Sequence, residues 1–213
     1  MISAGRIYAY VFILLTGLLA GCSGTHKMTA GADNIKVAQP RFFGPDFKKA
    51  LYKADMTVYG HELSGLMLFK KSRGLVRVAF ISEFGLKYFD LEVPANDTAA
   101  VTFHYLIDLM NRKPIVKMLK ISFRMLFLHY PENEKNHAFN CHDEWMVKVF
   151  KDEGEKAIYS YVQNSGQVSS ARQSGLCKPK VRMEAGDYTA QYPSGIQIWL
   201  KKKIKIDLVS VEE

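Results

Sequence analysis

Three stretches of sequence decide the fold: residues 63–71 (LSGLMLFKK), 75–82 (LVRVAFIS) and 86–93 (LKYFDLEV). The segments SRG (72–74) and EFG (83–85) separate them, and each contains a glycine suited to a short turn. Apolar runs joined by such turns are typical of consecutive antiparallel strands. In the second and third stretches apolar residues occupy alternate positions, which places them on one face of a strand. These apolar positions are Val76, Val78, Phe80, Phe89, Leu91 and Val93.

Downstream, the pattern changes to the period of an amphipathic helix. From Pro114 to Leu128 the basic residues Lys117, Lys120 and Arg124 share one stripe, opposite a stripe of apolar residues. Pro114 suits the first turn of this helix, where a missing N–H costs nothing. Shorter helices are expected near residues 46–53 and 105–111, and further strands at 145–150, 157–163, 167–173, 178–184 and 196–211. Strands, then helices, then more strands predict an α+β domain with a large antiparallel sheet.

The N-terminus has the features of an export signal. Arg6 precedes an apolar run over residues 11–19, which is too short for a membrane-spanning helix of about 20 residues. The sequence LAGC (19–22) resembles the lipobox of bacterial lipoproteins, in which small residues precede a cysteine that receives a lipid. Residues 1–21 are therefore expected to be a signal peptide and Cys22 a lipidation site. The alternative is an ordinary signal peptide followed by an incidental cysteine.

The chain after the signal divides into a tether and one domain. Residues 22–40 contain few apolar side chains and no periodicity, which is typical of a flexible tether, and residues 41–213 suffice for a single domain. An Asp directly after the lipidated cysteine would resemble the inner-membrane retention signal of bacterial lipoproteins, but this position holds Ser23. We therefore expect an outer-membrane lipoprotein whose domain faces the periplasm. A net charge of +8 suits an anionic lipid surface or a nucleic acid, but export argues against a nucleic-acid partner.

Residues that could carry chemistry are few. In an oxidising periplasm Cys141 and Cys177 could form a disulfide. The sequence leaves two alternatives open, a disulfide or two separate thiols. A second cluster lies in one loop around Cys141, and its spacing matches no standard zinc site: His137, Cys141, His142 and Asp143. A polar loop with surface histidines is the favoured interpretation. No nucleophile elbow, phosphate loop or dinucleotide motif is present, so we expect no catalytic residue, no metal and no cofactor.

Many Met, Phe and Leu residues lie between positions 63 and 128. Such residues most often form an ordinary core. On a sheet with few covering helices they can also line an apolar cavity for an acyl chain, with flexible methionines adapting its wall. The two interpretations can coexist. The residues expected to line such a cavity are Leu66, Leu68, Val76, Val78, Phe80, Phe89, Leu91, Met118, Leu119, Met125 and Leu126.

The segments Gly65–Lys71, Val76–Phe80 and Glu83–Leu91 resemble the early hairpins of the lipoprotein-sorting superfamily, the family of LolB-like receptors and LolA-like carriers. The resemblance implies an incomplete antiparallel β-barrel, covered by one or two helices, around a hydrophobic cavity for lipoprotein acyl chains. Because it is expected to be lipidated, the chain is more similar to the receptor than to the soluble carrier. In the receptor an apolar loop contacts the membrane, and the matching turn here is Phe84, Gly85 and Leu86.

The resemblance leads to a non-enzymatic function as the first hypothesis. The protein would accept acyl chains of lipoproteins, or another lipid, and help to place them in the outer membrane, with a periplasmic carrier protein as a partner. A second hypothesis is a structural or complex-assembly lipoprotein that binds a partner protein without transferring lipid. A third is a periplasmic hydrolase that uses the histidine-rich loop.

Overall fold

The computed structural model describes residues 41–94, 100–127, 139–141, 144–152, 155–164, 167–173, 181–189, 191–201 and 203–211, and within 139–164 it describes the backbone. The chain divides into two units, residues 1–30 and 31–213, and every described residue belongs to the second. The expected signal peptide, the lipidation site Cys22 and the tether (22–40) therefore lie outside the described residues. The described hydrophobic core lies entirely within residues 31–213.

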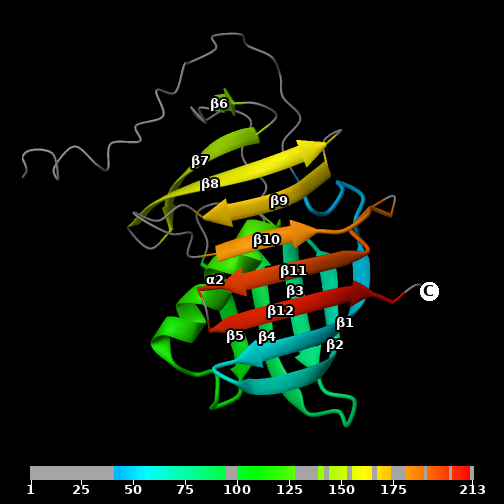
Figure 1. The fold of residues 1–213 in the computed structure, drawn as a ribbon. Helices are drawn as coiled ribbons and strands as arrows, with labels where there is room; N and C mark the ends of the chain where they lie inside the picture. Colours follow the sequence, from blue (N-terminus) through cyan, green and yellow to red (C-terminus); the bar gives the residue numbers. More distant parts are fainter. Residues whose placement is uncertain are drawn as a thin grey trace, which may run out of the picture. The chain divides into compact units, whose positions relative to one another are not determined.

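The described part of the chain forms one antiparallel sheet of twelve strands with a single helix against it (Figure 1). The strands are β1 (Lys49–Val58), β2 (His61–Ser72), β3 (Leu75–Ile81), β4 (Lys87–Pro94), β5 (Thr102–Leu106), β6 (Phe139–Cys141), β7 (Glu144–Asp152), β8 (Glu155–Asn164), β9 (Gln167–Gln173), β10 (Val181–Ala185), β11 (Gly195–Leu200) and β12 (Ile204–Ser210). Side chains are described for nine of them, β1–β5 and β9–β12.

The order of the strands is β5-β4-β3-β2-β1-β12-β11-β10-β9-β8-β7-β6. Each neighbour follows in sequence except where β1 pairs with β12, so the first and last strands lie side by side within the sheet. The sheet is open, with β5 and β6 as its edges. The segment that joins these two edge strands contains the helix α2 (Lys113–Phe127).

Helix α2 lies against one face of the sheet because one of its stripes is apolar. Pro114 occupies its first turn, as its fixed φ favours. The helix contacts β4 on one side and β10 and β11 on the other, so it fills the curve between the two parts of the sheet. The expected helix over 114–128 is thus confirmed to within one residue at each end. The basic residues Lys117, Lys120 and Arg124 are all partly buried.

The strands expected at residues 63–71, 75–82 and 86–93 are confirmed as β2, β3 and β4, with ends shifted by at most two residues. Three other expectations were wrong. The expected helices near 46–53 and 105–111 are replaced by β1 and by β5 with the turn that follows it. The expected strand 196–211 is two strands, β11 and β12, because Lys201 adopts a left-handed φ of 51° and turns the chain.

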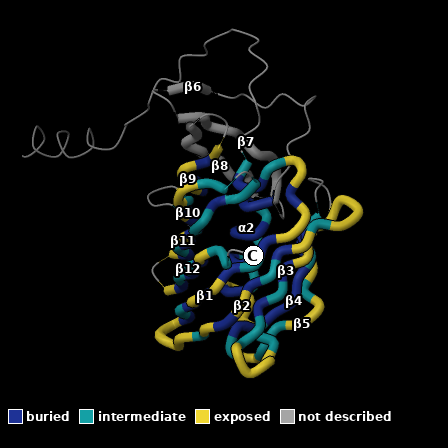
Figure 2. Tube along the Cα trace, turned by 90° about the vertical axis from the view of Figure 1, so that its right-hand side faces the viewer, coloured by how far each residue is buried: buried dark blue, intermediate teal, exposed yellow. Residues whose placement is uncertain are grey.

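The curvature of the sheet places one side of strands β1–β4 and β9–β12 in the core (Figure 2). On β1 every second residue is buried, from Ala50 to Val58. Gly65 on β2 marks a point where two strands approach closely, since a Cβ there would lie 2.1 Å from the backbone oxygen of Ile81. A glycine is therefore required where β2 passes the end of β3.

Candidate functional site

The concave face of the sheet is the candidate binding surface, and it is apolar. Nine of the eleven residues expected to line a cavity come together there, each buried in one cluster. They are Val76, Val78, Phe80, Phe89, Leu91, Met118, Leu119, Met125 and Leu126. The first five come from β3 and β4 and the other four from α2, so strand and helix periods converge on one surface.

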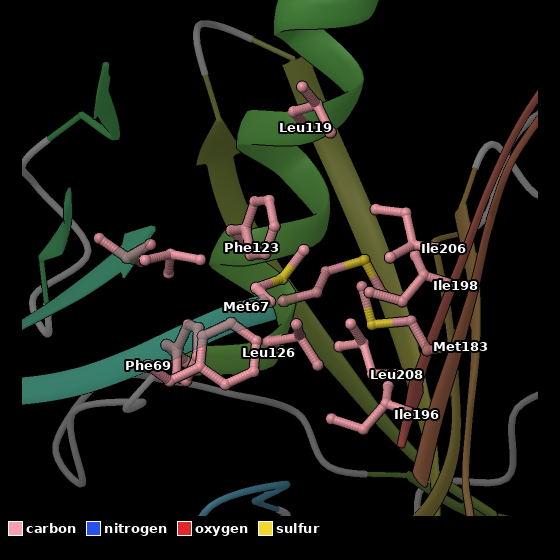
Figure 3. Packing of buried hydrophobic residues seen from close by; sticks show 14 of the residues in the cluster. Met67, Phe69, Leu119, Phe123, Leu126, Met183, Ile196, Ile198, Ile206 and Leu208 are labelled. Atoms are coloured by element: carbon pink, nitrogen blue, oxygen red, sulfur yellow. The ribbon is translucent and has the colours of Figure 1, made fainter. Parts of the chain in front are cut away.

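Helix α2 occupies this concave face. Leu119, Phe123 and Leu126 point into the space between β2 on one side and β10–β12 on the other (Figure 3). The ring of Phe123 lies 5.5 Å from that of Phe89, and the ring of Phe127 lies 5.3 Å from that of Phe69, both centroid to centroid. Such edge-to-face pairs stabilise packing beyond the area they bury. Side chains of α2 therefore cover the concave face of the sheet.

The two remaining expected residues, Leu66 and Leu68, lie on the opposite face of the sheet, so the expectation for them was wrong. Leu66 is 40% exposed, and Leu68 is partly buried on the same side. The register decides this, because Met67 pairs with Phe80 and Phe69 with Val78 on the inner face. In the run LMLF every residue is apolar, so composition does not reveal which alternate set points inward.

Several residues of the concave face were missed from the sequence. Met67 and Phe69 on β2 are fully buried. The C-terminal strands contribute the opposite wall, from Met183, Ile196, Ile198, Ile206 and Leu208 (Figure 3). A signal for these existed in β12, where apolar and charged residues alternate, but the pairing of β12 with β1 is long-range and sequence pattern does not show it.

An aromatic cluster closes the end of the concave face near the C-terminus of α2. The Phe43 ring lies 4.8 Å from that of Phe127 and 4.6 Å from that of Phe47. A small hollow of about 10 Å³, with room for about one water molecule, lies beside these rings. Arg41 and Lys71 line it together with the phenyl rings, and the Lys71 Nζ donates a hydrogen bond to the Pro45 carbonyl.

The turn between β3 and β4 projects apolar side chains into solvent. Phe84 is 98% exposed and Leu86 is 57% exposed. The turn is nevertheless well defined: the Ser82 backbone N–H donates to the Leu86 carbonyl, and the Ser82 Oγ accepts from the Leu86 N–H at 2.9 Å. Gly85 supplies the left-handed φ of 80° that the turn needs. The structure therefore leaves both apolar side chains of the turn exposed, not folded back into the core.

The outer face of the sheet carries an ion cluster beside this turn. Asp90 on β4 is only 4% exposed, and Arg77 donates to both of its oxygens, at 2.8 and 2.9 Å. Lys87 donates to the same carboxylate at 3.0 Å. The Arg77 hydrogen bonds lower the pKa of Asp90 to about 2, assisted by Lys87 and opposed by burial. The charges of the cluster therefore stay paired at neutral pH.

Two tyrosine hydroxyls near the concave face donate hydrogen bonds to backbone carbonyls. The Tyr52 hydroxyl donates to the Pro193 carbonyl at 2.8 Å, and burial raises the pKa of Tyr52. The Tyr188 hydroxyl donates to the Val168 carbonyl, and burial raises its pKa as well. Both hydroxyls are therefore neutral hydrogen-bond donors that fix backbone.

Some sequence expectations cannot be placed. His137, His142, Asp143 and Cys177 lie outside the described residues, and Cys141 is described only as backbone in β6. The disulfide and the role of the histidine-rich loop stay predictions. In the described ranges no three His, Cys, Asp or Glu side chains gather as a metal site.

None of the helical segments that the structure describes combines the length and apolar character needed to cross a bilayer. The arrangement of the described residues thus amounts to an apolar concave face covered by one helix, with an exposed apolar turn at one rim. No protein-family model matches the chain, and no curated protein is significantly similar to it.

Proposed function

We propose that this protein is a membrane-anchored lipid-binding protein that accepts lipoprotein acyl chains and helps to place them in the outer membrane. The observation that carries the proposal is the apolar concave face of an open sheet, which a single helix covers. In this proposal the sheet is an incomplete β-barrel. Its two edge strands are joined through the segment that carries α2, so a movement of α2 would expose the inside without breaking the described strand pairings.

Binding would replace contacts of α2 with contacts of acyl chains. Each methylene removed from water contributes about 0.8 kcal/mol. The burial of an acyl chain on the concave face would therefore offset the burial that the displaced α2 side chains lose. The methionines of the surface, such as Met67, Met118 and Met183, suit this exchange because their flexible side chains adapt to different shapes. Transfer to a bilayer is downhill if the bilayer buries the chains more completely than the protein does.

The β3–β4 turn would deliver the cargo. Phe84 and Leu86 are exposed on a turn with fixed hydrogen bonds, so their insertion into a bilayer would bury apolar surface with little ordering cost. The lipid on Cys22 and the tether (22–40) would keep the domain within reach of the outer membrane, facing the periplasm, where a soluble carrier protein would supply the cargo. No catalytic step, metal or cofactor is part of this proposal.

A binding assay with a matched variant tests the proposal. A fluorescent fatty acid should bind the protein and be displaced by a synthetic peptide with a triacylated N-terminal cysteine. A Phe84→Glu, Leu86→Glu double variant should bind the probe as the parent does, because both side chains lie outside the core. It should lose delivery of a lipoprotein to vesicles. A folded protein that binds neither probe nor peptide would remove the proposal.

The alternative is a structural or complex-assembly lipoprotein that binds a partner protein. The filling of the concave face by α2 favours it, because a completely packed core needs no ligand. In that case the fatty acid would not bind, and pull-down from an envelope extract would give one stoichiometric protein partner free of lipid.

A further inference from the structure

One polar side chain interrupts the apolar wall of the concave face. A cross-strand row runs over β1, β12, β11, β10 and β9, and each member is paired directly with the next. Its members, all of them buried, are Val58, Ile204, Leu200, Val181 and Gln173. Four apolar residues thus lead to a carboxamide at the β9 end of the row, and Gln173 is only 4% exposed.

The alternation of β9 places this carboxamide on the inner side of the sheet. Ala171 and Gln173 are buried, whereas Arg172 between them is exposed. Ala171 is paired with Met183 and Gln173 with Val181, and both partners belong to the core. The Gln173 side chain therefore shares its face with the wall that β10–β12 contribute.

The carbonyl oxygen of this carboxamide has no hydrogen-bond donor. The Gln173 Oε1 is buried and no N–H or O–H group reaches it. The other buried polar side chains of the described ranges are satisfied: Asp90 accepts from two cations, and the Ser122 Oγ donates to the Leu119 carbonyl at 2.9 Å. Two further acceptors without a donor belong to partly exposed side chains, those of Gln191 and Asp207.

Packing alone does not explain Gln173, because a buried acceptor without a donor disfavours the folded state. A methionine of similar shape would continue the apolar row without that cost. A ligand that brings a donor to this position would recover the cost on binding. The carboxamide therefore favours a ligand that has an N–H or O–H group beside an apolar chain.

The linkage of an acyl chain decides whether such a donor is present. A chain linked through an ester has only acceptor oxygens next to its first carbon, whereas a chain linked through a secondary amide has an N–H there. A triacylated N-terminal cysteine carries one amide-linked chain and two ester-linked chains. An acceptor in an apolar wall can thus distinguish the two kinds of chain.

We infer that Gln173 is a specificity-determining residue whose carbonyl oxygen accepts the amide N–H of an N-linked acyl chain. The inference rests on the proposed function, since it needs acyl chains on the concave face. It adds a selection for amide-linked over ester-linked chains. The amide lies at the β9 end of the row, and the methylenes lie along Val181, Leu200 and Ile204.

Two probes that differ at one atom test the inference. Palmitic acid N-methylamide has the N–H, and methyl palmitate has an ester oxygen in its place; each is used to displace the fluorescent fatty acid from the full-length protein. The parent should bind the amide about five times more tightly than the ester, and Gln173→Met should lose this preference. Gln197→Met makes the same change on an exposed residue of β11 and should keep it.

Loss of the preference in Gln173→Met, with a thermal midpoint at or above that of the parent, supports the assignment. Equal binding of amide and ester by the parent would overturn it, and this comparison requires no variant to fold. A preference that survives in Gln173→Met would overturn it too. So would a lowered thermal midpoint with an unchanged preference, since the carboxamide would then act through a structural contact such as an ordered water.

The failure of this inference differs from the failure of the proposed function. A folded protein that binds no acyl probe would overturn both, whereas binding of both probes without a preference would overturn the inference alone. Because other lipids also carry amide-linked chains, competition identifies the source. An N-palmitoyl cysteine peptide should compete more strongly than N-palmitoyl glucosamine, and the reverse order would overturn a lipoprotein as the source.

Discussion

Asp90 is a residue whose ionisation should control stability in acid. Its folded-state pKa is lowered to about 2, so it contributes stability above its ordinary pKa and loses that contribution as the pH falls from about 4 toward 2. The contribution is about 2 kcal/mol at most, and smaller in practice because Arg77 is half-exposed. Asp90→Asn should therefore flatten the decline in unfolding free energy between about pH 5 and pH 2, measured by urea unfolding.

Arg77, which is ion-paired with Asp90, offers a second variant for the same prediction. Arg77→Met removes the largest cause of the lowered pKa, so it should flatten the same part of the stability profile while leaving a carboxylate at position 90. A parent-like slope in both variants would show that the ion cluster does not contribute to folding.

Substitution of Gly65 tests the close approach of β2 and β3. Ala at this position would place a Cβ 2.1 Å from the Ile81 carbonyl oxygen, and a backbone atom cannot move aside cheaply. Gly65→Ala should lower the free energy of unfolding by about 3 kcal/mol. Gly195→Ala is the control, because its Cβ would meet the Leu208 oxygen at an ordinary 3.4 Å. Comparable thermal unfolding of the two variants would contradict the close approach of β2 and β3.

At the scale of elements, α2 should oppose both unfolding and ligand binding. Phe123→Leu removes part of the contact with Phe89 and should lower stability by about 1 to 2 kcal/mol. If α2 must move for an acyl chain to enter, the same variant should bind the fatty-acid probe about 5 to 30 times more tightly, because the competent state becomes more populated. Val116→Ala, on the partly exposed side of α2, should change neither value greatly. Weaker binding of the probe by Phe123→Leu would contradict displacement of α2.

The elements that the sequence predicted well are those with a strong local signal. The β2–β3–β4 meander and α2 follow from clear periods of two and of about 3.6, with Gly74, Gly85 and Pro114 at their boundaries. The elements predicted wrongly lack a local signal that matches their structure. Lys201 begins a turn without Gly or Pro, and residues 46–53 contain Lys, Ala and Leu, whose helix preference is overridden by pairing with β2 and β12.

Assignment of the candidate site failed where register decides. Leu66 and Leu68 belong to a strand that is apolar on both faces, and only its pairing with β3 directs Met67 and Phe69 inward. The walls from β10–β12 depend on the contact of the last strand with the first, which no local pattern reveals. The exposed turn could be located from its Phe-Gly sequence, although its exposure could not.

For the whole molecule, the proposed function depends on the open sheet and on the helix that covers its concave face. The β1–β12 pairing holds the two parts of the sheet together in the middle, while the edges β5 and β6 are bridged by the segment that contains α2. In the proposal, acyl chains can then replace α2 on the concave face while the described strand pairings persist. On the outside, the exposed β3–β4 turn would orient the same sheet on a membrane.

Site-specific photo-crosslinking tests acyl-chain binding on the concave face most directly. Benzoylphenylalanine is introduced in place of Phe69, which is fully buried on the inner face, or of its neighbour Leu68, which points outward. On irradiation with a triacylated peptide, the probe at position 69 should crosslink to the acyl chains and the probe at 68 should not. Equal crosslinking at the two positions, or none at 69 in a folded protein, would contradict the account.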